Sequence, residues 1–243
     1  TGNTDLKNLI INLRYEKYKK FVEHINIFNK YIQFTKENYD TENFFEDFSI
    51  GNILFAGFYL KKRNFNLAIK EFSSFTDIKH SVLNITNGEN LYLYSLNNLE
   101  EISNEVGIIE NKNLEKIKDI FLINKTLSDS ELIKIHSLKH IEKIEYLENL
   151  HISPSLNIEV INTLKKSNLI IFGPGTQHSS LFPSYLTKNL KDVLMDVKCN
   201  KILLTNIYFD NDLFHENALT LIEKFYFYMS NKKNIKDDKL IDF

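Results

Sequence analysis

The strongest chemical signal in the sequence is a short glycine-rich segment. The stretch "NLIIFGPGTQHSS" covers residues 168–180 and places Gly173, Pro174 and Gly175 directly after four apolar residues. The 243-residue chain has only seven glycines and three prolines, so this grouping points to a specialised backbone. Glycine at both positions permits positive φ and close approach of a ligand, while Pro174 stiffens the segment. We call residues 173–176 the GPGT loop.

The chemistry expected of the GPGT loop is anion binding. The apolar run before it predicts a central parallel strand, and ligands of open α/β sheets bind beyond the carboxyl ends of strands. Backbone N–H groups of the loop and of the following helix attract an anion such as phosphate. Thr176, Ser179 and Ser180 add hydroxyl donors, and His178 could contact the phosphate, act as an acid or point to solvent. The alternative is a tight turn with serine caps, since the pattern is neither GxGxxG nor a Walker loop.

A second and weaker signal lies in "SIGNILFAGFYL", residues 49–60. Gly51 and Asn52 open an apolar helix, and Asn52 could cap that helix or hydrogen-bond a base, sugar or phosphate. Gly57 lies inside the helix, where glycine costs about 1 kcal/mol relative to alanine. We therefore expect Gly57 to serve close packing or the approach of a ligand.

The elements that must position these residues follow from hydrophobic periodicity. The pattern predicts a loop over residues 36–48 and a helix N-cap at Asn64. Predicted helices cover residues 5–35, 50–62, 65–75, 129–140, 157–167, 179–197 and 214–229, and predicted strands cover residues 80–86, 90–96, 117–123, 168–172 and 201–207. Strands and helices alternate in the second half, which indicates an α/β fold with a parallel sheet.

Composition excludes several classes of partner. The net charge is -2, with 30 basic and 32 acidic residues, so there is no basic surface of the kind that binds nucleic acid. No apolar run is long enough to predict a transmembrane helix, so no membrane partner is expected. The single cysteine, Cys199, excludes an internal disulfide, fits a reducing compartment and is expected to be a small residue beside a buried strand. A cytoplasmic location is the resulting expectation.

Other polar residues have simpler interpretations than catalysis. His136 and His140 are four residues apart, which is metal-pair spacing, but two partly exposed helix histidines are the commoner case. Asp210 and Asp212 could reach a metal or a ribose, although acidic turn residues usually cap. None of these residues forms a catalytic constellation with a neighbour in sequence.

Taken in order, the segments resemble the 2-phospho-L-lactate transferase (CofD-like) superfamily. The stretch "SIGNILFAGFYL" is similar to the family's Gly-Asn helix, and "LKKSNLIIFGPGTQHSSLFPSYL" resembles its apolar strand, GPG[ST] and S-L-x-P-x-L block. The stretch "KILLTNIYFDND" resembles the strand and asparagine-containing turn that follow. The resemblance covers residues 49–210.

The resemblance implies a fold, a ligand and two branches of function. The implied fold is a doubly wound, Rossmann-like α/β domain with a mostly parallel sheet and helices on both faces. Residues 1–243 would form one such domain, without the family's first strand–loop unit and incomplete at the N-terminus. The implied ligand is a nucleoside diphosphate of the GDP or UDP type.

One branch of the family transfers a phospholactyl group to a deazaflavin alcohol with magnesium. The other, the gluconeogenesis-factor branch, binds a UDP-sugar and is regulatory.

The resemblance also assigns binding residues by position. The GPGT loop would line the diphosphate. Gly51 and Asn52 would face the nucleotide or the transferred group. The nucleotide- and phosphate-binding residues expected in this way are Gly51, Asn52, Gly173, Pro174, Gly175, Thr176, His178, Ser179 and Ser180, with Thr86, Asn87 and Asn206 at strand ends on the same rim. Catalytic residues and metal ligands stay unassigned.

The sequence also departs from the family pattern. The glycine-rich loop and the Asp-rich segment that the family associates with metal are not present, and Phe48 stands before Ser49 where the gluconeogenesis-factor branch has histidine. Two functions therefore remain open: a transferase that moves a phosphoryl-linked group from a nucleotide donor, and a non-catalytic nucleotide-binding regulator. Either would take a small nucleotide-linked molecule as its partner, and the resemblance leaves a homodimer open.

Overall fold

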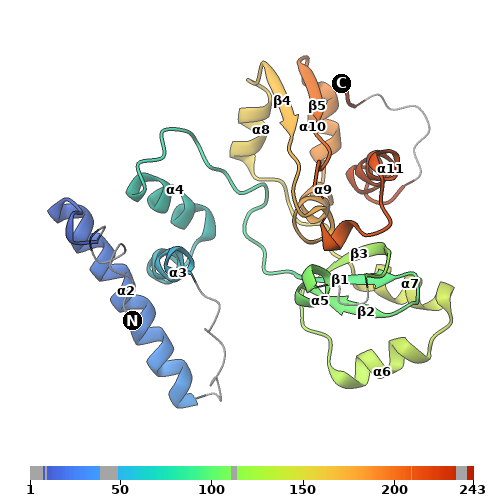
Figure 1. Cartoon of the computed structure of the whole chain (residues 1–243), viewed down its shortest axis with the longest axis horizontal. Helices are drawn as coiled ribbons and strands as arrows, with labels where there is room; N and C mark the ends of the chain where they lie inside the picture. Colours follow the sequence, from blue (N-terminus) through green and yellow to red (C-terminus); the bar gives the residue numbers. More distant parts are fainter. Residues whose placement is uncertain (1–7, 9, 39–48, 111–113, 209, 234–239) are drawn as a thin grey trace. The chain divides into compact units, whose positions relative to one another are not determined.

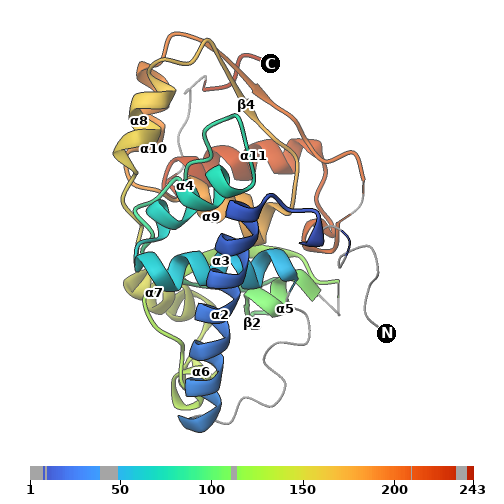
Figure 2. The same cartoon turned by 90° about the vertical axis from the view of Figure 1, so that its left-hand side faces the viewer.

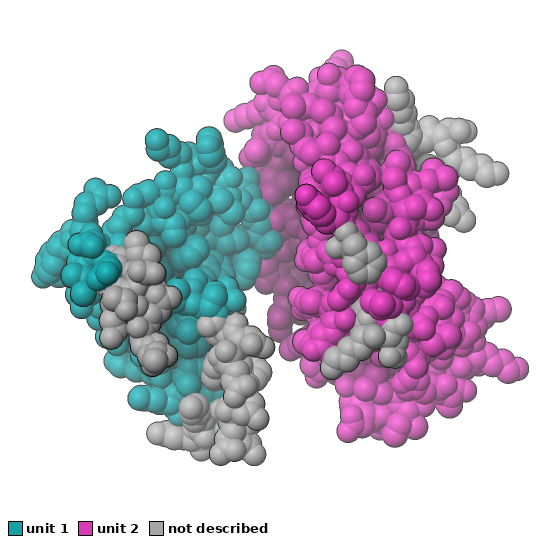
Figure 3. Space-filling model, in the orientation of Figure 1, with its two compact units in different colours: residues 1–84 teal, residues 85–243 magenta. Residues whose placement is uncertain are grey.

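The computed structural model of the chain describes residues 8, 10–38, 49–110, 114–208, 210–233 and 240–243 (Figure 1). It divides into two compact units, residues 1–84 and residues 85–243 (Figure 3). Most of the predicted loop over residues 36–48 lies outside the described residues.

Unit 1 contains three described helices of four or more residues, α2 (Tyr15–Asn38), α3 (Ile50–Lys62) and α4 (Phe65–Phe75). Figure 2 shows α3 running across α2. The three helices share a phenylalanine-rich core built on the buried side chains of α3 and α4. This core consists of Leu54, Phe58 and Ala68, with Phe21, Ile25, Phe55, Phe72 and Phe75 packed against it.

The helix starts in unit 1 are set by short polar side chains. The Oγ atom of Ser49 accepts a hydrogen bond from the Asn52 N–H at 3.2 Å, so Ser49, and not Asn52, caps α3. The Oδ1 atom of Asn64 accepts from the Leu67 N–H at 3.0 Å, which confirms the cap predicted there. Asn52 is therefore an exposed residue in the first turn of α3.

Gly57 lies where α3 and α2 approach closely. A Cβ atom at this position would lie 2.2 Å from the carbonyl oxygen of His24. His24 is buried, and its ring stacks on Phe58 with the ring centroids 3.6 Å apart. The structure thus confirms close packing as the reason for this glycine.

Replacing Gly57 by alanine is expected to lower the free energy of unfolding by about 2 kcal/mol, because the added methyl group must push two packed helices apart. Gly51→Ala is the matched control in the same helix. Its Cβ would meet only the Ser49 Oγ, at 3.6 Å, an ordinary contact. Denaturant unfolding of both variants tests the prediction, and equal stability of the two would contradict it.

Unit 2 begins with a three-stranded antiparallel sheet whose strand order is β2-β1-β3. The strands are β1 (Tyr92–Asn97), β2 (Ile102–Asn104) and β3 (Ile117–Ile123). Helices cover both faces of this sheet. Phe121 and Ile123 pack against α6 (Asp129–Ser137) and α7 (His140–Leu150), whereas Ile120 and Leu122 belong to the larger core shared with the C-terminal helices. The short helix α5 (Glu105–Glu110) follows β2.

The second sheet of unit 2 is a parallel pair, β4 (Leu169–Phe172) and β5 (Asn200–Leu203), with Leu169 opposite Asn200. The remaining elements lie around this pair in Figure 1. They are α8 (Ile158–Leu164), the π-helix η1 (Gln177–Leu181), α9 (Phe182–Tyr185), α10 (Leu190–Asp196), the 3-10 helix η2 (Asn211–Leu213) and α11 (Ala218–Met229).

The α/β class, the helices on both faces of a sheet and the parallel pairing in the second half are confirmed. Several details differ from the sequence prediction. Strands β1 and β3 pair antiparallel, and residues 80–86 form no strand beyond a single bridge between Thr86 and Leu156. The helix predicted over 179–197 is interrupted, because Asn189 takes a left-handed conformation with φ 61°. Helix α7 was not predicted.

Candidate functional site

The GPGT loop joins β4 to η1, as the sequence predicts. Among the described glycines only Gly88 and Gly175 have positive φ, and Gly175 at 159° is close to extended. The expectation of positive φ at Gly173 is therefore corrected. Glycine at 173 leaves open space instead, because a Cβ atom there would meet nothing within 4 Å. At Gly175 it would touch the Leu181 side chain, at 3.6 Å.

Asn206 fastens the loop from the segment after β5. Its Nδ2 donates to the Gly175 carbonyl at 2.8 Å, and its Oδ1 accepts from the Gly175 N–H at 3.4 Å. The same Oδ1 accepts from the Gln177 side-chain amide at 2.9 Å. Asn206 therefore lies beside the loop as predicted, but both ends of its amide are used to hold the loop.

Two hydroxyl groups lie together at the start of η1. The Oγ1 of Thr176 and the Oγ of Ser180 are 2.8 Å apart. Ser180 is exposed and Thr176 is partly buried. The Ser180 and Leu181 N–H groups both donate to the Thr176 carbonyl at 3.2 Å, and the Leu181 bond, which spans five residues, makes the wide turn of the π-helix. The two hydroxyl groups therefore form a polar pair at the C-terminal end of the GPGT loop.

The first N–H groups of η1 are not available to an external anion. The Asp212 Oδ2 accepts the His178 N–H at 2.9 Å and the Ser179 N–H at 3.2 Å. The Ser179 hydroxyl also points at this oxygen, at 3.5 Å. Asp212 and Ser179 are both buried. The expectation that these two N–H groups and the Ser179 hydroxyl bind phosphate is therefore corrected: an internal carboxylate takes them.

The ring of His178 faces the protein interior. Its side chain is 0% exposed, and its Nε2 lies 2.8 Å from the Nζ of Lys224 on α11. Burial, followed by the charge of Lys224, holds the pKa of His178 well below 6.5, so the ring is neutral near pH 7. His178 thus neither points to solvent nor acts as an acid on a ligand in this arrangement.

Lys224 links the ring of His178 to the first sheet. Its Nζ donates to the Ile117 carbonyl at 2.5 Å and forms an ion pair with the Glu216 Oε1 at 2.7 Å. The Glu216 side chain is 1% exposed, so this is a buried pair. Burial lowers the pKa of Lys224, and the charge of Glu216 opposes that shift.

The other predicted binding residues belong to the first turn of a helix in unit 1 and to a turn in unit 2. Gly51 and Asn52 belong to the first turn of α3 in unit 1. The Thr86 Oγ1 accepts from the Gly88 N–H at 3.2 Å in a turn, and Asn87 is exposed in the same turn. Neither Thr86 nor Asn87 ends a strand. The structure thus brings together the GPGT loop, Ser180 and Asn206, with His178 and Ser179 turned inward behind them.

No metal site is formed by the described part of the chain. Within it there is no group of three or more His, Cys, Asp or Glu residues that could hold a metal ion. His136 lies on α6 and His140 on α7, where its Nδ1 is 3.0 Å from a Glu100 carboxylate oxygen. The Asp210 Oδ1 caps η2 by accepting from the Asp212 N–H at 3.3 Å. The described residues thus contain no preformed cluster of metal ligands, and magnesium stays a prediction.

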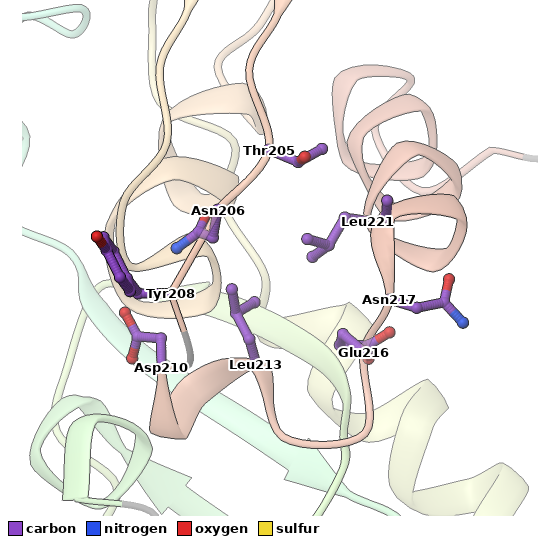
Figure 4. A pocket seen from close by; sticks show the side chains of 9 residues that line it. Thr205, Asn206, Tyr208, Asp210, Leu213, Glu216, Asn217 and Leu221 are labelled. Carbon is purple, nitrogen blue, oxygen red and sulfur yellow. The ribbon is translucent and has the colours of Figure 1, made fainter.

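A small pocket lies next to Asn206, between the segment after β5 and the start of α11 (Figure 4). The side chains of Thr205, Leu213 and Leu221 point into it. Its volume is about 120 Å³. This is well below the roughly 300 Å³ at which small-molecule pockets begin, so it could hold only part of a nucleotide.

Within the described residues, no helix is both long and apolar enough to cross a membrane.

The chain matches one family along nearly its whole length. The family profile described as 2-phospho-L-lactate transferase CofD matches residues 3–225. The chain belongs to this CofD family. The match includes the GPGT loop and both compact units.

Two curated relatives carry the name gluconeogenesis factor. The Listeria monocytogenes serovar 1/2a protein of that name is 29% identical over 91 residues, which is 35% of this chain and 27% of the relative. The putative gluconeogenesis factor of Thermotoga maritima is 20% identical over 167 residues, 69% of this chain and 44% of the relative. The chain thus spans less than half the length of these curated relatives.

Two crystal structures of one Bacillus halodurans protein of the UPF0052 family have a similar fold. One has a TM-score of 0.57 at 18% identity and covers 93% of this chain and 60% of its own. The second has a TM-score of 0.57 at 17% identity and covers 83% and 56%. The likeness supports the CofD-like α/β fold.

Proposed function

We propose that the chain binds a nucleoside-diphosphate-linked compound at the GPGT loop and transfers its phosphoryl-linked group to an acceptor. The observation that carries this proposal is the open space at Gly173, where a Cβ would meet no atom within 4 Å. Asn206 holds the neighbouring Gly175 on both its N–H and its carbonyl, so the loop has a fixed shape. A fixed backbone with glycine at 173 and 175, followed by the paired hydroxyls of Thr176 and Ser180, suits a diphosphate.

The proposed reaction is a displacement at phosphorus. An acceptor hydroxyl attacks the β-phosphorus, and a new P–O bond forms. The bond from this phosphorus to the bridging oxygen breaks, and the nucleoside monophosphate leaves with the electron pair, while the hydroxyl proton passes to solvent. The loop would bind and orient the diphosphate. No step is assigned to magnesium, because the described residues contain no preformed cluster of metal ligands.

The second candidate is a regulator that binds a UDP-sugar without turnover. One observation favours it: the curated relatives are named gluconeogenesis factors. The same loop would serve both functions, so the two candidates differ in turnover and in metal dependence.

Calorimetric titration with GDP, GTP, UDP and UDP-N-acetylglucosamine, with and without magnesium, separates the candidates. The transferase predicts one preferred diphosphate whose binding magnesium strengthens, with release of a nucleoside monophosphate when an acceptor is supplied. The regulator predicts magnesium-independent binding of an intact UDP-sugar and no release. Failure of all four compounds to bind would reject both candidates.

Side chains added at Gly173 are expected to weaken nucleotide binding without unfolding the protein. Gly173→Ala places a methyl group in open space, and Gly173→Val fills more of it. We expect affinity to fall with side-chain size, by about tenfold or more for valine, because the ligand needs that space. The melting temperature should stay near the wild-type value for both variants. Unchanged affinity in the valine variant would mean that no ligand approaches Gly173.

A further inference from the structure

Three side chains from the C-terminal part of the chain form hydrogen bonds with the GPGT loop and η1. Asn206 holds Gly175, Asp212 holds the first N–H groups of η1, and Lys224 holds the ring of His178. These three residues come from three separate places, the segment after β5, the helix η2 and the helix α11. The shape of the loop therefore depends on residues far along the chain.

The contacts of Asp212 are those of an internal anion. Its side chain is 2% exposed, and the His178 and Ser179 N–H groups converge on one oxygen, Oδ2. Its other oxygen, Oδ1, has no hydrogen-bond partner among the described residues. Burial, opposed by the N–H bonds and reinforced by Asp210, raises the pKa of Asp212 to about 6. Near pH 7 Asp212 is therefore mainly charged, although burial opposes the charge.

Lys224 holds the ring of His178, the residue of η1 whose N–H donates to Asp212. The Lys224 Nζ donates to the His178 Nε2, so Nε2 is the unprotonated ring nitrogen. The ring also packs edge-on against Phe182, with the centroids 5.0 Å apart. Backbone and ring of His178 are thus tied to two different elements, which leaves the start of η1 little freedom to turn.

We propose that Asp212 and Lys224 are positioning residues of the nucleotide site. They contact no ligand themselves, because both are turned into the interior against η1. Instead they hold η1 in its π-helical form, so that residues 173–176 and the Ser180 hydroxyl face a diphosphate. Such preorganisation strengthens binding by removing the cost of ordering the loop when the ligand arrives. The proposal rests on the proposed nucleotide-binding function.

Hydrogen exchange of the free protein tests the positioning directly. In Asp212→Ala, the amides of residues 177–181 are expected to exchange about tenfold faster or more, because two of them lose their acceptor. Asp212→Asn keeps an oxygen acceptor and should restore slow exchange. Asn157→Ala is the control, since Asn157 is also a buried acceptor for a helix N–H, at the start of α8. Equal protection of residues 177–181 in the alanine variant and wild type would overturn the proposal.

Nucleotide titration then tests the consequence for binding. With whichever of GDP, UDP or UDP-N-acetylglucosamine the wild type binds, Asp212→Ala should weaken binding about tenfold, and Asp212→Asn should recover it to within about threefold. Asn157→Ala should bind within about twofold of wild type even if its melting temperature falls equally. Wild-type affinity in the folded alanine variant would overturn the proposal.

The two proposals fail in different ways. If wild type binds none of the nucleotides, the proposed function fails while the exchange result still decides whether Asp212 shapes the loop. If Asp212→Ala does not fold, Asp212→Leu replaces it, because a near-isosteric apolar side chain removes the acceptor without burying a charge. Slow exchange and unchanged binding in the folded leucine variant would count against the proposal in the same way.

Discussion

Replacing Lys224 by methionine is expected to lower the free energy of unfolding by about 3–5 kcal/mol. Among the described residues, the change leaves the Glu216 carboxylate, whose side chain is 1% exposed, with Lys116, at 3.7 Å, as its remaining ion-pair partner. It also removes the donor to the Ile117 carbonyl and to the His178 ring. Methionine fills the same volume, so the loss reports the buried charge and the missing hydrogen bonds. Thermal and denaturant unfolding measure it.

Two comparisons separate the buried charge from other effects of this substitution. Lys125→Met removes an ion pair with Glu131, at 2.5 Å, in which the lysine side chain is 51% exposed, and it should change the melting temperature little. Adding Glu216→Gln to Lys224→Met should recover part of the lost stability, because no unpaired charge then remains buried. If Lys224→Met unfolds at the same denaturant concentration as wild type, the pair does not stabilise the fold.

The elements that the sequence predicts well are those with a local cause. Strand β4 was predicted because "LIIF" is a continuous apolar run that ends at glycine. The cap at Asn64 was predicted because a short polar residue precedes an apolar helix, and its Oδ1 accepts the expected N–H. Gly57 was expected to allow close packing or the approach of a ligand, and the His24 carbonyl occupies the space that a Cβ would need, which fits close packing. Each signal lies within a few residues of its effect.

The sequence does not reveal how the strands of the first sheet pair. The residues of β1 and β3 alternate between two cores, with Leu93 and Tyr94 on opposite faces, as in any strand covered on both sides. That pattern is the same for parallel and antiparallel neighbours. The direction is set by the connections and by packing across the sheet, which periodicity does not encode.

The positions of the GPGT loop and of Asn206 could be predicted from the sequence, but the orientations of the neighbouring side chains could not. The apolar strand β4 correctly predicted a loop directly after it, and Asn206 lies beside this loop as expected. His178 and Ser179 were expected to face a ligand because they follow a glycine loop. Their orientation is decided by Asp212, 33 to 34 residues further along, and by Lys224, 46 residues from His178. The "FDND" segment could suggest a cap, but nothing local says which helix Asp212 caps.

Stability is expected to fall as the pH drops from 6.5 to 4 because of His151. This histidine ends α7, and its Nδ1 accepts the Leu122 N–H of β3 at 3.0 Å, while the Ile152 N–H donates to the Leu122 carbonyl at 2.8 Å. His151 and Ile152 thereby satisfy the N–H and the carbonyl of Leu122 on β3. Only a neutral ring can accept at Nδ1. Burial, followed by the charge of Lys232, lowers the pKa of His151 to about 4.

The direction of this pH dependence follows from the protons that His151 binds in the folded and the unfolded chain. Between pH 6.5 and 4 the unfolded chain binds a proton at His151 and the folded chain does not, so acid favours unfolding. The difference of about 2.5 pKa units corresponds to about 3 kcal/mol, present above pH 6.5 and lost by pH 4. Asp212 acts in the opposite direction over part of this range, because its folded pKa of about 6 lies above 3.8.

Variants isolate the contribution of His151 from that of Asp212. In His151→Asn the amide oxygen can still accept the Leu122 N–H but does not titrate, so its stability relative to wild type should rise as the pH falls below 6.5. His136→Asn, at an exposed position of α6, gives the effect of losing a histidine away from β3. Denaturant unfolding at pH 7.5, 6, 5 and 4 measures both. A difference between His151→Asn and wild type that stays constant across this range would show that protonation of this ring is not linked to unfolding.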